Sequence, residues 1–171
     1  MRSDRGYTLF ELLIVLGLIG VVSGIAIPVF LSSNAMNDLW TSSERLGALI
    51  RQTRLKAISQ NTTYQVRFDC PAAGSARGLV MSGNPAQDDD PNRCSQNFDG
   101  DSEIIMMETG VAYDQGAATA LQVTGRGVFT AIGGAIPLNI SVTYGSSARY
   151  LTVSQTGQIT FSNTAPAEPE E

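Results

Sequence analysis

A carboxylate at the edge of a long apolar run is the residue whose chemistry most needs a partner. Glu11 stands directly before the stretch from Leu12 to Leu31, in which no residue is charged. A helix of that length matches a hydrocarbon core of about 30 Å. A charge held in low dielectric is costly unless it is paired. We therefore expect Glu11 to meet a cation; the alternative is a single-span anchor in which Glu11 only reaches the membrane surface.

The apolar run also carries residues that favour helix packing and a local break. Gly17, Gly20 and Gly24 fall on one helical face, where small residues allow close backbone approach. Pro28 removes one helical donor, and its ring presses against the carbonyl of Gly24. The sequence predicts a kink or an unwound turn near Pro28.

Catalysis finds little support in the residue types. The chain contains no histidine, which excludes Ser-His-Asp and Cys-His arrangements and H-E-x-x-H helices. No phosphate loop or G-x-S-x-G motif is present, and nothing fixes two carboxylates together. We predict that the protein is not an enzyme and uses no cofactor.

The two cysteines, Cys70 and Cys94, enclose an irregular stretch. In an oxidising compartment one pair has one intramolecular connectivity, and closing such a loop stabilises by roughly 3 kcal/mol. A structural disulfide is favoured over free thiols. A redox or metal role lacks a C-x-x-C motif.

Acidic residues gather in the same region. Clustered hard oxygens beside turns can bind calcium, but no EF-hand spacing is present, so a solvated acidic loop is the competing interpretation and no metal is expected. The candidate ligands are Asp88, Asp89, Asp90, Asp99 and Asp101.

Charge argues against nucleic acid as the main partner. The chain has 11 basic and 16 acidic residues, a net charge of −5. A basic cluster on the second half of the long helix is interpreted as a solvated face, with acidic neighbours or DNA as alternatives. It consists of Arg45, Arg51, Arg54 and Lys56.

Hydrophobic periodicity sets the elements that position these groups. From 32 to 60 a three- and four-residue period predicts an amphipathic stem helix that packs on one side. The expected packing residues are Met36, Leu39, Trp40, Leu46, Leu49, Ile50, Ala57 and Ile58.

From 61 to 162 the period becomes two and predicts an antiparallel β domain closed by a hairpin through Gly157. The expected strands are Thr63 to Phe68, Gly78 to Met81, Glu103 to Met107, Leu121 to Thr124, Leu138 to Tyr144, Tyr150 to Ser154 and Gln158 to Phe161. Residues 163–171 read as a disordered acidic tail. The fold class is α+β.

The N-terminus resembles the class III signal of type IV pilins and type II secretion pseudopilins. A short leader with Arg2 and Arg5 ends in Gly6, and Tyr7-Thr8-Leu9-Phe10-Glu11 then opens the apolar run. The resemblance implies a pilin-like fold, removal of residues 1–6 by a prepilin peptidase, and N-methylation of Tyr7. Tyr7 departs from the usual Phe but keeps the aromatic ring. In a polymer of such helices, Glu11 would pair with the α-ammonium on Tyr7 of a neighbour.

The order of the stem, a variable middle and the closing R-Y-L-T-V-S-Q-T-G-Q-I-T-F resembles the GspH/FimT subgroup of minor pseudopilins and minor pilins, which includes FimU. This implies a structural or priming subunit of a pilus or pseudopilus. Its partners would be other subunits, the peptidase and an inner-membrane assembly platform. Basic residues in the leader place that end in the cytoplasm and the β domain in the periplasm.

The alternative function within the subgroup is a DNA-binding minor pilin for DNA uptake. DNA capture needs several arginines grouped on the β domain. Those present are widely spaced in the sequence, which favours the structural subunit: Arg67, Arg77, Arg93, Arg126 and Arg149.

Overall fold

The computed structural model describes residues 8–166, and for residues 27–32 it describes the backbone alone. The chain divides into two compact units, one up to Asn37 and one from Asp38 onward. Two of the predicted segments lie outside the described residues: the leader with the following Tyr7, and the end of the acidic tail. Helix α1 (Leu9–Gln60) contributes to both units and is helical without interruption through Pro28. The structure therefore has no unwound turn there, and the kink stays a prediction.

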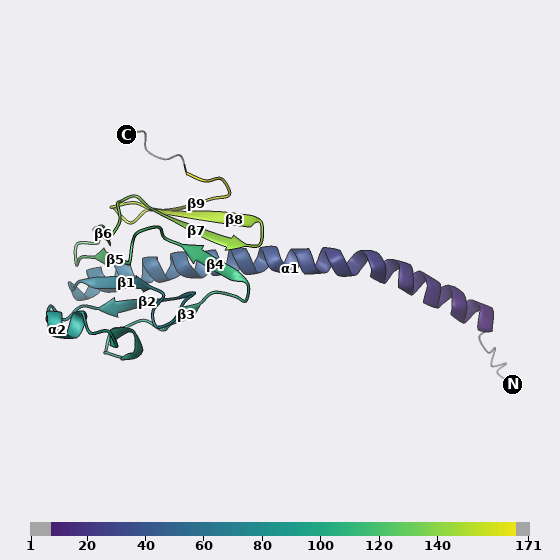
Figure 1. Ribbon diagram of the computed structural model, residues 1–171, viewed down its shortest axis with the longest axis horizontal. Coiled ribbons are helices and arrows are strands. Elements are labelled where there is room, and N and C mark those ends of the chain that lie inside the picture. Colours follow the sequence, from purple (N-terminus) through teal and green to yellow (C-terminus); the bar gives the residue numbers. More distant parts are fainter. Residues whose placement is uncertain (1–7, 167–171) are drawn as a thin grey trace. The chain divides into compact units, whose positions relative to one another are not determined.

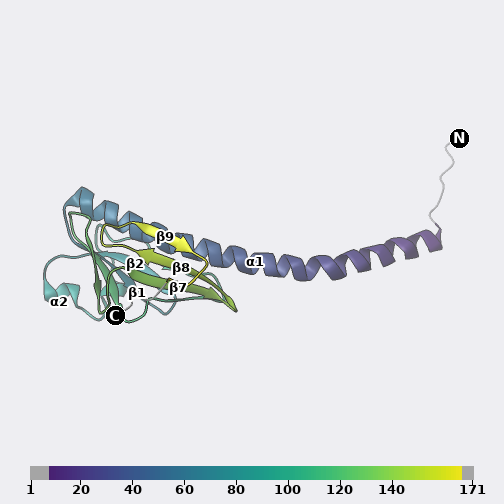
Figure 2. The same ribbon diagram turned by 90° about the horizontal axis from the view of Figure 1, so that it is seen from above.

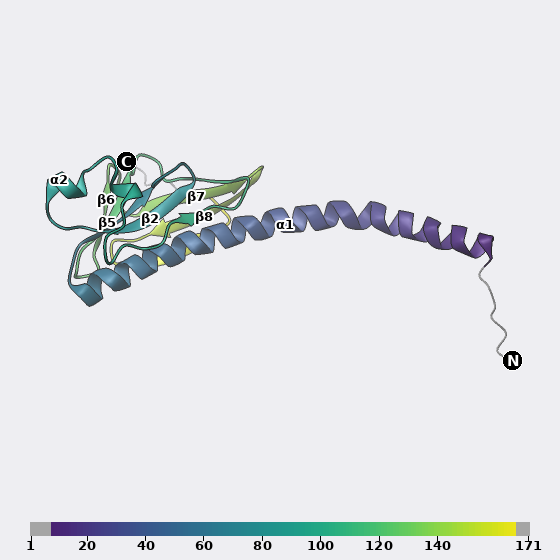
Figure 3. The same cartoon turned by 90° about the horizontal axis from the view of Figure 1, so that it is seen from below.

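The second unit contains the end of α1 and two antiparallel sheets. Figure 1 shows the elements in chain order, and Figures 2 and 3 show both sheets on the same side of the C-terminal half of α1. The strands are β1 (Tyr64–Phe68), β2 (Ser75–Val80), β3 (Ile105–Met106), β4 (Val111–Asp114), β5 (Ala120–Val123), β6 (Phe129–Ile132), β7 (Leu138–Tyr144), β8 (Ser147–Val153) and β9 (Ile159–Ser162). This confirms the predicted α+β class.

The first sheet has the order β3-β2-β1-β5-β6, and the second has the order β4-β7-β8-β9. The central strand β1 pairs Val66 with Gly78 of β2 and with Leu121 of β5. In the second sheet β7 and β8 form the longest pairing, from Leu138 opposite Val153 to Tyr144 opposite Ser147.

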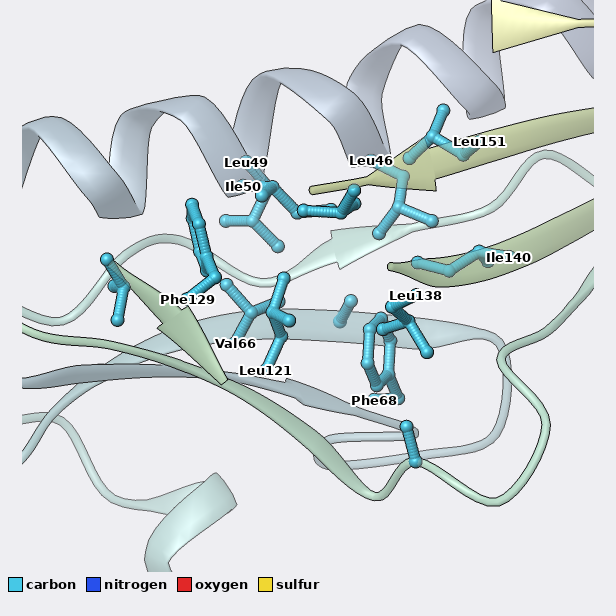
Figure 4. Close-up of a cluster of buried hydrophobic side chains, with 14 of the residues drawn as sticks. Leu46, Leu49, Ile50, Val66, Phe68, Leu121, Phe129, Leu138, Ile140 and Leu151 are labelled. Atoms are coloured by element: carbon cyan, nitrogen blue, oxygen red, sulfur yellow. The ribbon is translucent and has the colours of Figure 1, made fainter. Parts of the chain in front are cut away.

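The core forms where the helix covers both sheets (Figure 4). Leu46, Leu49 and Ile50 of α1 are buried. They pack with Val66 and Phe68 of β1, Leu121 of β5, Phe129 of β6, Leu138 and Ile140 of β7, and Leu151 of β8. Each such side chain contributes about 1.5–3 kcal/mol when it leaves water. The buried side of the stem is thus part of the domain core.

Two glycines allow close approach at this helix. A Cβ on Gly47 would lie 2.8 Å from the ring of Phe161 on β9. Gly157 has a φ of +80°, which side chains disfavour, and a Cβ there would lie 2.7 Å from Arg54. Gly157 closes the hairpin between β8 and β9, as the sequence predicts.

The predicted strands are confirmed in place, with shifted ends. Leu138 to Tyr144 has the predicted bounds, whereas β2 begins at Ser75, because it pairs along the whole of β1. Strands β4 and β6 were not predicted. Each has four residues, of which one is buried and one is partly buried.

The irregular middle of the chain carries two short helical turns, α2 (Pro85–Asp88) and η1 (Arg93–Ser95). Asn84 caps α2 by accepting a hydrogen bond from the N–H of Ala86.

Candidate assembly site

The N-terminal part of α1 is apolar and uncovered. The segment Leu9–Ala26 has a mean hydropathy of 2.5, and it is the one helix in the described residues that is long and apolar enough to cross a membrane. Its large side chains are exposed, with Leu12, Leu16 and Val21 at 57%, 56% and 65%. An ordinary soluble surface does not expose a continuous apolar helix, so this segment needs an apolar environment.

Thr8 caps this helix, and Glu11 lies in its first turn. The hydroxyl of Thr8 accepts a hydrogen bond from the N–H of Glu11 at 3.2 Å, and the carbonyl of Thr8 accepts one from Leu12. A carboxylate in the first turn also interacts favourably with the helix dipole. Among the described residues Glu11 has no ion-pair partner. The predicted partner is the amino terminus of Tyr7 on a neighbouring subunit, and Tyr7 lies outside the described residues.

The stem buries a narrower arc than the sequence predicts. Leu39, Leu46, Leu49, Ile50 and Ala57 are buried as predicted. The prediction is wrong for Met36, Trp40 and Ile58, which are 46%, 44% and 43% exposed. Trp40 and Ile58 each follow a buried residue directly, and one residue turns the helix by about 100°, which carries both side chains past the buried arc.

Small polar residues occupy part of that arc. Ser42, Ser43 and Thr53 are buried, and two of them fix the domain to the stem. The hydroxyl of Ser42 accepts a hydrogen bond from the N–H of Glu108, and that of Ser43 accepts one from Arg149. The hydroxyl of Thr53 has no hydrogen-bond partner in the described residues.

Two of the four basic residues of the stem bind the carbonyls of loops. The Nε of Arg54 donates to the carbonyl of Gly127, and the Nζ of Lys56 donates to the carbonyls of Gly100 and Asp101 at 3.0 and 3.2 Å. The solvated-face interpretation is therefore wrong for Arg54 and Lys56. It fits Arg45 and Arg51 better, since Arg45 forms an exposed ion pair with Glu108 and Arg51 is exposed above the ring of Phe161.

Arg149 of β8 connects the second sheet to the stem. Its guanidinium lies 3.7 Å from the ring centroid of Trp40 and 4.5 Å from that of Phe161. It also donates to the hydroxyl of Ser43 and forms an ion pair with Glu44 at 3.0 Å. Nothing local in the sequence of β8 distinguishes Arg149 from a solvated strand residue, so sequence reasoning missed this role.

The structure contains a disulfide between Cys70 and Cys94, with Cα atoms 5.2 Å apart. It joins the end of β1 to η1 across the irregular stretch. The neighbouring Arg93 is 1% exposed. Its two terminal nitrogens bind both carboxylate oxygens of Asp101 at 2.8 Å.

The acidic loop is not fully solvated, because two of its carboxylates are bound by groups of the protein. Asp101 accepts from Arg93 and from the N–H groups of Val80 and Phe98, while Asp88 accepts from Ser82 and Gly83. The oxygens of these two carboxylates therefore already accept hydrogen bonds from the protein. The residues that the structure describes hold no group of three possible metal ligands. Asp89 and Asp99 are exposed, and Asp90 accepts from Asn92 and Gln96.

Hydrogen bonding keeps both buried carboxylates ionised. Burial alone would raise the pKa of Asp101, but Arg93 and the two backbone donors outweigh it, so the pKa lies below its ordinary value. The pKa of Asp88 is lowered in the same way, because bonds from Ser82 and Gly83 outweigh its burial.

Three of the five arginines of the β domain are buried inside it. Arg77, Arg93 and Arg149 are 3%, 1% and 5% exposed. Arg77 donates to the carbonyls of Ser102, Cys94 and Gln96. Arg67 is half-buried on the carbonyl of Asp88, and Arg126 is exposed.

Comparisons with known proteins agree with this division into an apolar helix and a pilin-like domain. Residues 1–27 match the family described as the prokaryotic N-terminal methylation motif. Type II secretion system protein H of Pseudomonas aeruginosa is 33% identical over 69 residues, which cover 40% of each chain. The pilin-like protein PilA1 of Thermus thermophilus is 39% identical over 72 residues, which cover 42% of this chain and 45% of PilA1. The chain thus spans less than half the length of either relative in these matches.

The crystal structure of the type IV minor pilin FimU of Pseudomonas aeruginosa resembles the fold. The likeness covers 74% of this chain and 90% of FimU, with a TM-score of 0.53 and 17% identity. The chain thus carries the N-terminal methylation motif and is similar in sequence to a type II secretion protein and a pilin-like protein, and its fold is that of a pilin.

Proposed function

We propose that this chain is a minor, non-enzymatic subunit of a type IV pilus or a type II secretion pseudopilus, in a structural or priming role. The observation that carries the proposal is the contrast within α1: Leu9–Ala26 is apolar and uncovered, and the same helix ends inside a folded domain. Residues 7–31 would be the membrane and assembly helix, 32–60 the stem, and 61–162 the globular domain.

The leader, residues 1–6, would be removed by a prepilin peptidase between Gly6 and Tyr7, and the new amino terminus would be methylated. The chain would then sit in the bacterial inner membrane as a single span with its domain in the periplasm, where the Cys70–Cys94 disulfide can persist. From there the assembly platform would add it to a filament of other subunits.

Glu11 would act during that addition. The N–H of Glu11 is already used by Thr8, but its carboxylate has no cation among the described residues. Pairing with the ammonium of Tyr7 on a neighbouring subunit would remove the cost of holding either charge alone in low dielectric.

Substitution of Glu11 tests the proposal. Glu11→Ala should leave membrane level and disulfide formation unchanged, while crosslinking between cysteines placed near Tyr7 and near Glu11 of adjacent subunits should drop strongly. Thr8→Ala is the control for helix capping, because it removes the cap and keeps the carboxylate. Unchanged crosslinking and filament function in Glu11→Ala would favour the simple anchor.

The DNA-binding alternative is not proposed. It needs accessible arginines, and Arg77, Arg93 and Arg149 make their contacts inside the domain.

A further inference from the structure

The face of the first sheet that points away from α1 carries a hollow. Side chains of a strand alternate between the two faces of a sheet, and Val66, Leu121 and Phe129 lie in the core that α1 covers. Their neighbours on β1, β5 and β6 therefore point outward. Over β2 this outer face is covered by the disulfide-closed segment, whose carbonyls bind Arg77. At β5 and β6 it opens into a hollow of about 310 Å³.

A row of three side chains on adjacent strands forms the floor of this hollow. Arg67 of β1 stands opposite Ala120 of β5, which stands opposite Ile132 of β6. Neighbouring strands are about 4.8 Å apart, so the backbones at Arg67 and Ile132 are roughly 10 Å apart. The side chain of Ala120 is a single methyl group, so the middle of the row leaves room for a small ligand. That ligand would lie between a charged end and an apolar end.

Hydrogen bonds hold the guanidinium of Arg67 in place. Its Nε donates to Gln65 at 3.2 Å, and Gln65 donates in turn to Gln122. Its Nη2 donates to the carbonyl of Asp88. Among the described residues Nη1 has no acceptor, and Arg67 forms no ion pair. A guanidinium that is oriented in advance is well suited to bind a carboxylate.

Hydrogen-bond acceptors also line the hollow. Asp89, directly after α2, is exposed, and its carboxylate has no ion pair in the part of the chain that the structure describes. The hydroxyl of Thr119 donates to the carbonyl of Ile132, which leaves its lone pairs available to a donor. Arg67 and Asp89 thus bring opposite charges to one hollow without pairing with each other.

We propose that this hollow binds the head group of a free amino acid, in which one carbon carries both an ammonium and a carboxylate. The carboxylate accepts from Nη1 of Arg67, and the ammonium donates to Asp89 and Thr119. An apolar side chain of the ligand lies on Ala120 and Ile132. A zwitterion gives both charges of the hollow a partner at once, which a simple anion or cation does not. The volume is at the lower end of ligand sites, which suits a small molecule.

The inference goes beyond the proposed function and does not depend on it. Saturation-transfer NMR of the full chain in detergent tests it, with L-leucine as the probe. Leucine should bind saturably. Leucinamide lacks the carboxylate and N-acetylleucine lacks the ammonium, so each should bind about tenfold more weakly, as expected when a hydrogen bond between charged groups is lost.

Two variants assign the two ends of the ligand. Arg67→Met should weaken leucine binding about tenfold and should bind leucine and leucinamide equally. Asp89→Asn should do the same for leucine and N-acetylleucine. Asp99→Asn, at an exposed aspartate outside the hollow, is the matched control and should leave the preference for leucine unchanged. If Arg67 only held the loop after α2, Arg67→Met would retain the preference of the unaltered chain for leucine over leucinamide.

Filling the hollow provides a third variant. Ala120→Leu adds three carbons to its floor and should weaken leucine binding by about tenfold or more. Ala112→Leu, at an exposed position of β4 in the second sheet, should not. Retention of the Cys70–Cys94 disulfide shows that each variant is folded. Asp89→Asn breaks no ion pair of the described chain, so it remains informative if Arg67→Met does not fold.

Three outcomes would overturn the amino-acid site. The first is a lack of saturable leucine binding, and the second is equal binding of leucine and both analogues by the unaltered chain. The third is leucine binding that Arg67→Met and Asp89→Asn leave unchanged, because the ligand would then lie elsewhere. None of these outcomes bears on processing at Gly6 or on the crosslink between Tyr7 and Glu11, so the proposed function is tested separately.

Discussion

The two ends of helix α1 have similar side chains and opposite surroundings. Leu16, in the N-terminal part, is 56% exposed, while Leu46, in the C-terminal part, is fully buried beneath two sheets. The first part has no protein partner in the described residues, and the second provides the centre of the domain core. The same apolar chemistry therefore builds the core of the domain at one end and leaves an uncovered apolar surface at the other.

The sharpest way to disturb the folded end alone is Asp101→Asn. Arg93 would remain buried without its carboxylate, and such a change typically lowers the free energy of unfolding by about 3–5 kcal/mol. Urea unfolding of the full chain in detergent, followed by the fluorescence of Trp40, measures it. Asp99→Asn, at an exposed neighbour, should have almost no effect. Equal effects of the two variants would show that the buried ion pair does not stabilise the domain.

A matched pair of Leu→Ala substitutions tests the comparison on one helix. Leu46→Ala should lower the free energy of unfolding by about 2–5 kcal/mol, because a cavity remains beneath the sheets. Leu16→Ala should leave domain unfolding unchanged and weaken only assembly, which the Tyr7–Glu11 crosslink measures. A loss of domain stability in Leu16→Ala would show that the N-terminal part of α1 also stabilises the domain, which would contradict the comparison.

Removal of the disulfide should affect the domain and spare the helix. Replacing Cys70 and Cys94 with Ser should cost roughly 3 kcal/mol of unfolding free energy by freeing the unfolded chain. Urea midpoints give the change. Membrane level should remain normal as long as the domain stays folded at growth temperature.

Acid should weaken the domain through Asp101 and Asp88. Because the pKa of each is lowered by folding, their stabilisation is present above the ordinary carboxyl pKa of about 4 and is lost as pH falls through the folded value. Urea midpoints at pH 7 and pH 3 should therefore differ, and the difference should shrink in Asp101→Asn. An equal difference in that variant would assign the acid sensitivity to other carboxylates.

The elements that depend on local pattern were predictable, and those that depend on distant contacts were not. Periodicity of 3.6 and of 2 located α1 and the strand Leu138 to Tyr144, and two isolated cysteines led to the disulfide. Arg93 and Asp101 look like solvated loop residues in the sequence, because their partners are set by how an irregular segment folds over β2. Trp40 fits the apolar period and is nevertheless exposed, because an offset of one residue moves it off the buried arc.

The central claim is that the uncovered helix is the processed assembly element of a pilin-type subunit. Intact-mass analysis of the full chain recovered from bacterial membranes tests it most directly, with Gly6→Leu as the matched variant. The account predicts a chain that begins at Tyr7 with one added methyl group, and an unshortened chain for Gly6→Leu. A chain that retains residues 1–6, or a shortened and methylated Gly6→Leu chain, would contradict it.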